Sequence, residues 1–590
     1  MMILRMIFIA FACTAFLPGN APAQLPPVFG DAFGEQTQDD PRIRKYISPR
    51  RIVWQSDPDG TTIQNAARLL KAGNGQAELI NNDLCILKST AGKKPGILLD
   101  FGKELHGGIE LVTGMMDRKD PVKVRVRFGE SVSEAMSEIG SPHGATNDHA
   151  MRDFIVELPW LGSMEVGNSG FRFVRIDLVD PDAELFLKEV RAVFIYRDIP
   201  YLGSFKSNDE RLNQIWETGA YTVHLNMQQY LWDGIKRDRL VWVGDLHPEV
   251  MTVNAVFGYN EVVPKSLDLI RDATPLPAWM NGISSYSLWW IIVHRDWYLY
   301  HGDLGYLKQQ REYLRELLNL LVTKIDGNKE ALDGHRFLDW PSSENKQAIH
   351  AGLQALMVMA LDAGAELSRV LGENSTARQC EEAETRLRKH VPDPGNSKQA
   401  AALLALAGMM DAEKANNQVI AVGGAKDFST FYGYYMLHAK AMAGDYQGAL
   451  DNIRQYWGGM LDLGATTFWE DFDLSWLENA APIDELVPPG KTDVHATYGG
   501  YSYKQLRHSL CHGWASGPTS WLTRHVLGVS VLEPGAKVIR IDPHLADLEW
   551  VEGAFPTPYG VVRIRHTQTG EGKVKTEVDA PDEVKVLLAR

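Results

Sequence analysis

The strongest constraint on the fold is a hydrophobic period that changes twice along this 590-residue chain. In residues 122–128, Val and Phe alternate with Lys and Arg, which is the period-two pattern of a half-buried strand, and residues 171–178 and 193–196 repeat it. From Ser207 to about residue 527, apolar residues recur at helical spacing instead. Short alternating runs return after Gly528. A chain of this length exceeds one core, so the pattern predicts a multidomain, mainly α protein with a helical domain between two β-domains.

The helical region has recognisable beginnings and ends. Ser207 with Glu210 three residues later has the spacing of a capping box, which predicts a helix start. Further helices are expected at residues 313–324, 351–371, 400–410, 431–443, 447–456 and 517–527. At average helix and loop lengths, about ten to twelve helices fit into this region.

The domain boundaries follow from these changes of pattern. Residues 24–203 are predicted to form a β-sandwich accessory domain, residues 204–528 the helical domain, and residues 529–590 a small antiparallel β-domain. Residues 1–23 read as a secretory signal peptide, because Arg5 precedes a short apolar run and Ala21-Pro22-Ala23 offers a cleavage point. We therefore expect a secreted or periplasmic protein. No later stretch is predicted to cross a membrane.

Charge and cysteine content exclude several classes of protein. The formal net charge of −15 leaves no basic stripe to neutralise phosphates, so no nucleic-acid partner is expected. The predicted mature chain keeps Cys85, Cys380 and Cys511, which is too few for a disulfide framework. No phosphate-binding loop, nucleophile elbow or zinc-ribbon spacing occurs, so neither a cofactor nor a metal site is predicted.

The stretch richest in potential chemistry is residues 233–249, which read DGIKRDRLVWVGDLHPE. Asp238 and Asp245 are seven residues apart and would share one face of a helix, whereas Gly234, Gly244 and Pro248 favour a loop. In either case several charged groups and one tryptophan are expected around a common space: Asp233, Arg237, Asp238, Trp242 and Asp245. Unequal surroundings there would push the pKa values of the carboxyls apart and make one acid and one base.

This stretch resembles the signature of bacterial α-L-rhamnosidases of glycoside hydrolase family 78, D-C-x-x-R-[DE]-R-L-x-W-x-G-D. Gly234 stands at the usual cysteine, and Asp238 stands where most members carry the glutamate that acts as general acid. The resemblance implies an (α/α)6 barrel and assigns the acid role to Asp238, with a side chain one methylene shorter. Asp233 and Asp245 are expected to accept hydrogen bonds from sugar hydroxyls as ionised carboxylates.

A second stretch, GATTFWEDFD at residues 464–473, resembles the family's GATTxWE segment, where the glutamate is the general base. The resemblance therefore assigns that role to Glu470, with Trp469 beside it. Hydrolysis of a glycosidic bond needs two carboxylates, one protonated and one ionised. A gap of about 6.5–9.5 Å would admit water and invert the anomeric carbon, whereas about 5 Å would require a covalent intermediate.

A third stretch, SLCHGWASGPT at residues 509–519, resembles a late barrel segment of the family. The resemblance implies that His512 contacts the sugar and that Trp514 forms an aromatic wall. Trp289, Trp290 and Trp340 match aromatic positions of family pockets. An aromatic wall would favour the methyl group of rhamnose over a hydroxymethyl group.

These motifs predict an exo-acting, inverting α-L-rhamnosidase that acts on a rhamnose-containing carbohydrate. Two alternatives stay open. One is a different barrel glycosidase or a lyase that acts on rhamnose- or uronate-containing glycans. The other is a carbohydrate-binding protein that has lost catalysis, which the aspartate at position 238 motivates. Glu249 is a rival for the acid, although its position after Pro248 also suits the first turn of a helix.

Overall fold

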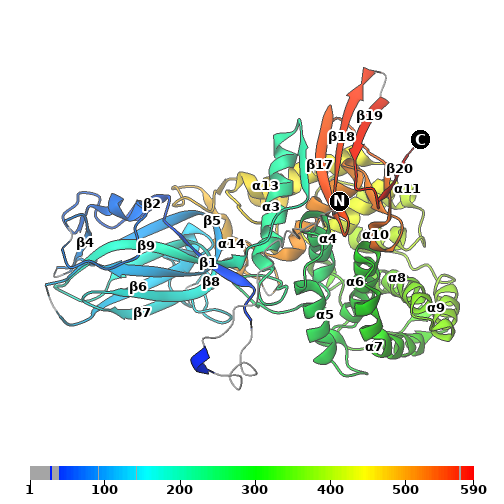
Figure 1. The fold of residues 1–590 in the computed structure, drawn as a ribbon, viewed down its shortest axis with the longest axis horizontal. Coiled ribbons are helices and arrows are strands. Elements are labelled where there is room, and N and C mark those ends of the chain that lie inside the picture. The colour runs from blue at the N-terminus through cyan, green and yellow to red at the C-terminus, as the bar shows by residue number, and fades with distance from the viewer. Residues whose placement is uncertain are drawn as a thin grey trace, which may run out of the picture.

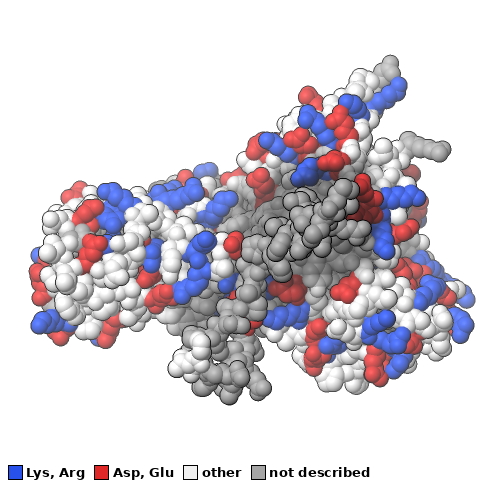
Figure 2. Space-filling model, viewed as in Figure 1, with Lys and Arg blue, Asp and Glu red and all other residues white. Residues whose placement is uncertain are grey.

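The computed structural model describes residues 27–29 and 39–589, apart from residues 81, 91, 118, 141, 502, 571 and 572. The predicted signal peptide lies outside the described residues. A strand-rich N-terminal region, a helical central region and a strand-rich C-terminal region follow one another in the chain (Figure 1). On the face shown in Figure 2, acidic and basic side chains of the described residues are interspersed over all three regions.

The described strands of the N-terminal region are joined in one nine-stranded sheet, in the order β3-β4-β9-β5-β8-β6-β7, with β1 paired to β9 and β2 to β5. The alternation at residues 122–128 is confirmed as a strand, β6, in which Val122, Val124 and Val126 are fully buried. The strand bounds are β1 Arg42–Ile47, β2 Arg51–Gln55, β3 Ile63–Gln64, β4 Cys85–Lys88, β5 Gly96–Thr113, β6 Val122–Gly129, β7 Asp153–Leu158, β8 Ser163–Leu178 and β9 Glu184–Arg197. The short helix α2 (Val132–Met136) follows β6 directly.

The central region is helical, as the periodicity predicts. Its first helix, α3, begins one residue after Asp209, whose carboxylate accepts from Arg211 N and Leu212 N. The expected cap at Ser207 is therefore wrong, because the Ser207 hydroxyl accepts from Asp209 N instead. The longer helices are α3 Glu210–Asn226, α4 Leu246–Val256, α5 Val262–Asp272, α6 Ser284–His301, α7 Leu304–Thr323, α8 Lys346–Val370, α9 Asn374–Leu387, α10 Lys398–Leu406, α12 Gly433–Met442 and α13 Tyr446–Asp462.

Helix α8 corrects one expectation from the sequence. By length and composition it is apolar enough to cross a membrane, although no later stretch was expected to be. However, 83% of its most apolar 18-residue window is buried inside the protein. Its apolar residues pack in the core of the helical region, which is the common reason for such a helix in a globular protein.

The C-terminal region contains two small sheets. Strands β17 (Trp550–Thr557), β18 (Gly560–Thr569) and β19 (Lys573–Asp579) form an antiparallel sheet, and β10 (Ser204–Ser207) adds to its edge from the start of the helical region. In the second sheet, β16 (Val538–Ile541) pairs with β20 (Lys585–Leu588) in parallel. The prediction of a purely antiparallel domain is therefore wrong, because residue alternation does not record strand direction.

Candidate active site

A cavity of about 330 Å³ lies where residues 233–245 meet α6 and the loops at residues 335–340 and 503–512. Seven of the predicted residues line it: Asp233, Arg237, Asp238, Trp242, Asp245, Trp340 and His512. The structure therefore brings together side chains from three distant stretches of the chain. Ile283, Tyr286 and Phe337 extend its apolar wall. None of these three was predicted, because nothing local in the sequence distinguishes them from core residues.

The first stretch is a loop rather than a helix until α4 begins at Leu246. Two adjacent residues, Asp238 and Arg239, have φ angles of 56° and 59°, in the left-handed region that non-glycine residues rarely occupy. This turn directs Asp238 into the cavity, whereas Arg239 donates to Asn168 O (3.0 Å) in the N-terminal region. Backbone held in such a conformation is often found at functional sites.

Arg237 connects the two predicted catalytic carboxylates. Its Nη1 lies 3.2 Å from Asp238 Oδ1, and its Nη2 donates to Glu470 Oε1. The guanidinium also lies over the ring of Tyr503, 4.1 Å from the centroid. Asp238 and Glu470 therefore contact the two terminal nitrogens of one guanidinium group.

Glu470 is buried, with a side chain only 1% exposed, and is not among the residues that line the cavity. Its Oε2 accepts from Ser509 N (3.3 Å), and Oε1 lies 3.4 Å from His512 Nε2. Burial raises the pKa of this carboxyl, while Arg237 opposes the shift. Because Arg237 and His512 contact both the cavity and Glu470, the carboxylate lies directly behind the cavity wall.

Asp238 has different surroundings, because its side chain is 15% exposed and faces the cavity. Trp242 Nε1 donates to Asp238 Oδ2 (3.0 Å). His149 Nε2 lies 3.2 Å from Oδ1, and the same nitrogen lies 2.9 Å from Arg507 Nη2. His149 belongs to the N-terminal region, so two regions of the chain build the surroundings of Asp238. Sequence reasoning missed it, because no local pattern connects positions 149 and 238.

A buried ion cluster fixes the N-terminal region against the stretches at residues 233–245 and 509–519. Lys236 lies 3.0 Å from Glu130 Oε2 and 3.3 Å from Glu134 Oε1, and Glu130 also accepts from Leu510 N (2.6 Å). Burial raises the pKa of Glu130 to about 7, with Lys236 opposing. Glu130 and Glu134 come from the N-terminal region, so this region holds the loops that carry Arg237 and His512.

Asp233 and Asp245 are almost completely buried. Asp233 accepts from Leu240 N (3.0 Å), and Asp245 accepts from the Tyr286 hydroxyl (2.6 Å). Burial raises the pKa of both carboxyls well above the ordinary value, and neighbouring carboxylates add to the shift. These surroundings therefore disfavour the ionised form of both carboxyls relative to water. A protonated carboxyl both donates to and accepts from a sugar hydroxyl.

Four predicted aromatic residues do not line this cavity. Trp289 stacks against both His247 and Tyr435, and Trp290 Nε1 donates to Leu267 O (3.2 Å). Trp469 packs edge-on against Phe472. Trp514 stacks on Phe431 and donates from Nε1 to Glu470 O (3.0 Å), so it positions the backbone of Glu470. All four are at most 3% exposed, and their apolar surface is used in the core.

Glu249, the rival for the acid, lies in the first turn of α4. Both of its carboxyl oxygens are buried without a hydrogen-bond partner among the described residues. Burial raises its pKa well above the ordinary value. It does not line the cavity, so the structure places Asp238 closer to a bound sugar.

A helical domain with two carboxyls beside a sugar-sized cavity defines a site of the kind found in acid–base glycosidases. Residues 200–526 match the family described as the bacterial alpha-L-rhamnosidase six-hairpin glycosidase domain, and residues 528–589 match the bacterial alpha-L-rhamnosidase C-terminal domain. The first match covers more than half of the chain. The chain therefore belongs to the bacterial α-L-rhamnosidase family of glycoside hydrolases.

Individual relatives agree with this placement. An alpha-L-rhamnosidase of Alteromonas sp. (strain LOR) is 24% identical over an alignment of 535 residues that covers 81% of this chain and 54% of that protein. The structure of a family 78 rhamnosidase of Bacillus sp. GL1 has a TM-score of 0.71 at 20% identity and covers 89% of this chain and 56% of its own. A rhamnosidase of Klebsiella oxytoca with rhamnose bound has a TM-score of 0.63 at 19% identity, covering 82% of this chain and 96% of its own. The chain thus spans about half the length of the curated relative from Alteromonas.

Proposed function

We propose that this chain is an exo-acting α-L-rhamnosidase that releases terminal rhamnose with inversion at the anomeric carbon. The observation that carries the proposal is the placement of Asp238 and Glu470 on the two ends of Arg237, one facing the cavity and one behind it. Family membership supplies the reaction class. The cavity's apolar side, formed by Trp242, Ile283 and Phe337, suits the methyl group of rhamnose.

In this mechanism Asp238 gives its proton to the leaving oxygen. The contact with His149 supports the role. Arginine has only hydrogen-bond donors, so His149 Nε2 accepts from Arg507. The same nitrogen lies 3.2 Å from Asp238 Oδ1, so the imidazole packs directly against the carboxyl. His149 therefore acts as a positioning residue that holds the acid ready at the mouth of the cavity.

Glu470 accepts the proton of the attacking water. Arg237 stabilises its ionised form despite burial, because the guanidinium donates directly to the carboxylate. Asp233, Asp245 and His512 bind hydroxyl groups of the sugar ring. These hydrogen bonds strengthen as positive charge develops on the ring in the transition state.

The finer architecture belongs to the same proposal. The helical domain is an (α/α)6 barrel, since its helices carry the six-hairpin glycosidase match. The N-terminal sheet folds into a β-sandwich. In support, residues of β4, β5, β6, β8 and β9 pack into one apolar core, and the pairing register of β5 with β8 shifts between Asp100 and Leu105. The protein is secreted or periplasmic, as the N-terminal sequence predicts.

A second candidate function is sugar binding without catalysis. The observation in its favour is the shorter acid at position 238. Release of p-nitrophenol from p-nitrophenyl α-L-rhamnoside separates the two functions. The proposal expects turnover by the wild type and a loss of at least about a hundredfold in Glu470→Gln. Rhamnose binding without turnover of this substrate or of natural rhamnosylated oligosaccharides would leave only the second candidate.

A further inference from the structure

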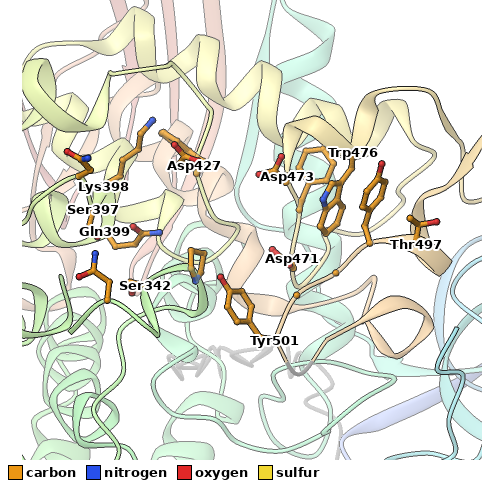
Figure 3. A pocket seen from close by; sticks show the side chains of 18 residues that line it. Ser342, Ser397, Lys398, Gln399, Asp427, Asp471, Asp473, Trp476, Thr497 and Tyr501 are labelled. Atoms are coloured by element: carbon orange, nitrogen blue, oxygen red, sulfur yellow. Dashed lines mark hydrogen bonds between the residues drawn. The ribbon is translucent and has the colours of Figure 1, made fainter. Parts of the chain in front are cut away.

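A second cavity, of about 570 Å³, lies beside the first. Ser342, Ser397 and Gln399 lie on one side of it, and Asp471 and Trp476 lie on the other (Figure 3). The first side comes from the loops that begin α8 and α10. The second side comes from the stretch that carries Glu470.

Residues that are neighbours in the chain line the two cavities. Trp340 lines the first cavity and the next residue, Pro341, lines the second; Tyr503 and Tyr501 divide in the same way. Trp340 stacks on Tyr501 with centroids 5.5 Å apart and donates from Nε1 to the Tyr503 hydroxyl (3.0 Å). A glycan that enters the first cavity by its terminal sugar therefore has the second cavity within its reach.

The stretch GATTFWEDFD serves both cavities. Glu470 turns towards Arg237, while Asp471 and Asp473 line the second cavity. These two acids have no part in the acid–base mechanism proposed above. The Asp473 carboxylate accepts from Ser475 N through Oδ1 (2.8 Å), which leaves Oδ2 for a ligand.

The charge of the second cavity is negative. Asp427, Asp471 and Asp473 line it, against one amine, Lys398. The Lys398 amine already donates to Gly424 O (2.8 Å) and Lys426 O (2.6 Å). Burial raises the pKa of Asp471 to about 6, which leaves it ionised at neutral pH. Such a lining repels a uronate carboxylate and accepts hydrogen bonds from neutral hydroxyls.

Aromatic surface completes the arrangement. Trp476 and Tyr498 are stacked with centroids 5.3 Å apart and an interplanar angle of 4°. Tyr501 is 43% exposed and lies between the two sides in Figure 3. The exposed ring of Tyr501 beside hydroxyl acceptors suits a sugar, which has both apolar faces and polar edges.

We propose that the second cavity binds a neutral sugar of the same glycan, next to the terminal rhamnose, and that its carboxylates select against a uronic acid there. The inference rests on the proposed function and adds the class of substrate: rhamnosylated neutral oligosaccharides.

The test compares kcat/KM for three substrates: p-nitrophenyl α-L-rhamnoside, an α-L-rhamnosyl glucose and the matching α-L-rhamnosyl glucuronic acid. The wild type is expected to prefer the neutral disaccharide over the acidic one by at least about tenfold. The double variant Asp427→Asn/Asp473→Asn removes two charges and is expected to lose most of this preference. Asn suits both positions, because Asp427 has a φ of 61° and Asp473 caps a short helix.

Two controls isolate the second cavity. Turnover of p-nitrophenyl α-L-rhamnoside, which has no second sugar, is expected to stay within about twofold in the double variant. The matched variant Asp411→Asn changes another helix-capping carboxylate that lines neither cavity, and is expected to leave the preference intact. Equal use of the two disaccharides by the wild type would overturn the inference, as would an unchanged preference in the double variant.

Failure of the proposed function would look different, because the wild type would then release no rhamnose from any of the three substrates. In that case titration calorimetry with rhamnose and with α-L-rhamnosyl glucose decides the inference alone. Tighter binding of the disaccharide that is lost in the double variant supports it. Equal affinity for the two sugars contradicts it.

Discussion

The two carboxylate-bearing stretches, residues 233–245 and 464–473, meet at Arg237 but place their acids in unlike surroundings. Asp238 is 15% exposed, whereas Glu470 is 1% exposed. Glu470 accepts hydrogen bonds from Arg237 and from Ser509 N, which both belong to the helical region. Asp238 also contacts His149 from the N-terminal region. The comparison teaches that two carboxyls joined by one guanidinium can have different burial and different partners, and the roles proposed for them rest on that difference. It also shows that the surroundings of Asp238 include a residue of the N-terminal region.

The largest effect is expected for Glu470→Gln. Loss of the carboxylate should lower kcat/KM by about a thousandfold for every rhamnoside. The attacking water needs a base whichever leaving group the substrate carries. Measurement with one reactive aryl rhamnoside and one alkyl rhamnoside checks this. Glu478→Gln, an exposed acid shortly after the same stretch, is the matched control and should be neutral. Activity close to the wild type in Glu470→Gln would remove the buried carboxylate from the mechanism.

For Asp238→Asn the loss should depend on the leaving group. An alkyl rhamnoside needs a proton on its leaving oxygen and should lose about a hundredfold or more in kcat/KM. A dinitrophenyl rhamnoside departs without help and should be affected far less. Equal losses with both substrates would mean that Asp238 is not the acid, and the contrast with Glu470 would then disappear.

His149→Gln should follow the pattern of Asp238→Asn with a smaller amplitude, about tenfold on the alkyl rhamnoside. The reason is that His149 positions the acid and does not itself supply the proton. His143→Gln, in the same N-terminal segment but outside the cavity lining, is the control. A loss that is equal for both leaving groups would indicate a purely structural role for His149.

The smallest effect is a shift in pH dependence. Burial raises the pKa of Glu470 above its ordinary 4.5, so the base loses activity by protonation at a pH above that value. Arg237 lowers the same pKa, so Arg237→Gln should move the acidic limb of kcat/KM further upward. A limb that moves downward or stays in place would contradict the contact between Arg237 and the base.

The sequence predicted the main elements and half of the residues that line the cavity. The alternation of apolar and basic residues predicted strand β6. The charged stretch at residues 233–245 contains five of the residues that line the cavity. In both cases the signal lies within a few residues, because the strand and the loop each organise their own side chains.

The rest depends on contacts between distant residues. The sequence around position 149 does not indicate that His149 contacts Asp238. Likewise, the sequence around Lys236 does not indicate its buried contact with Glu130. Trp289 and Trp290 were expected in the sugar pocket but lie in the core, because an aromatic ring fits either place equally well in a sequence. The parallel direction of β16 and β20 is also absent from the local pattern, because alternation of residues is the same in parallel and antiparallel strands.

The stereochemistry of the released sugar tests the central claim most directly. Proton NMR of the first minutes of hydrolysis identifies the anomer before mutarotation scrambles it. Two carboxyls that act as acid and base on a water molecule predict that β-L-rhamnose appears first from an α-L-rhamnoside. The initial appearance of α-L-rhamnose would mean a covalent intermediate and would contradict the role given to Glu470.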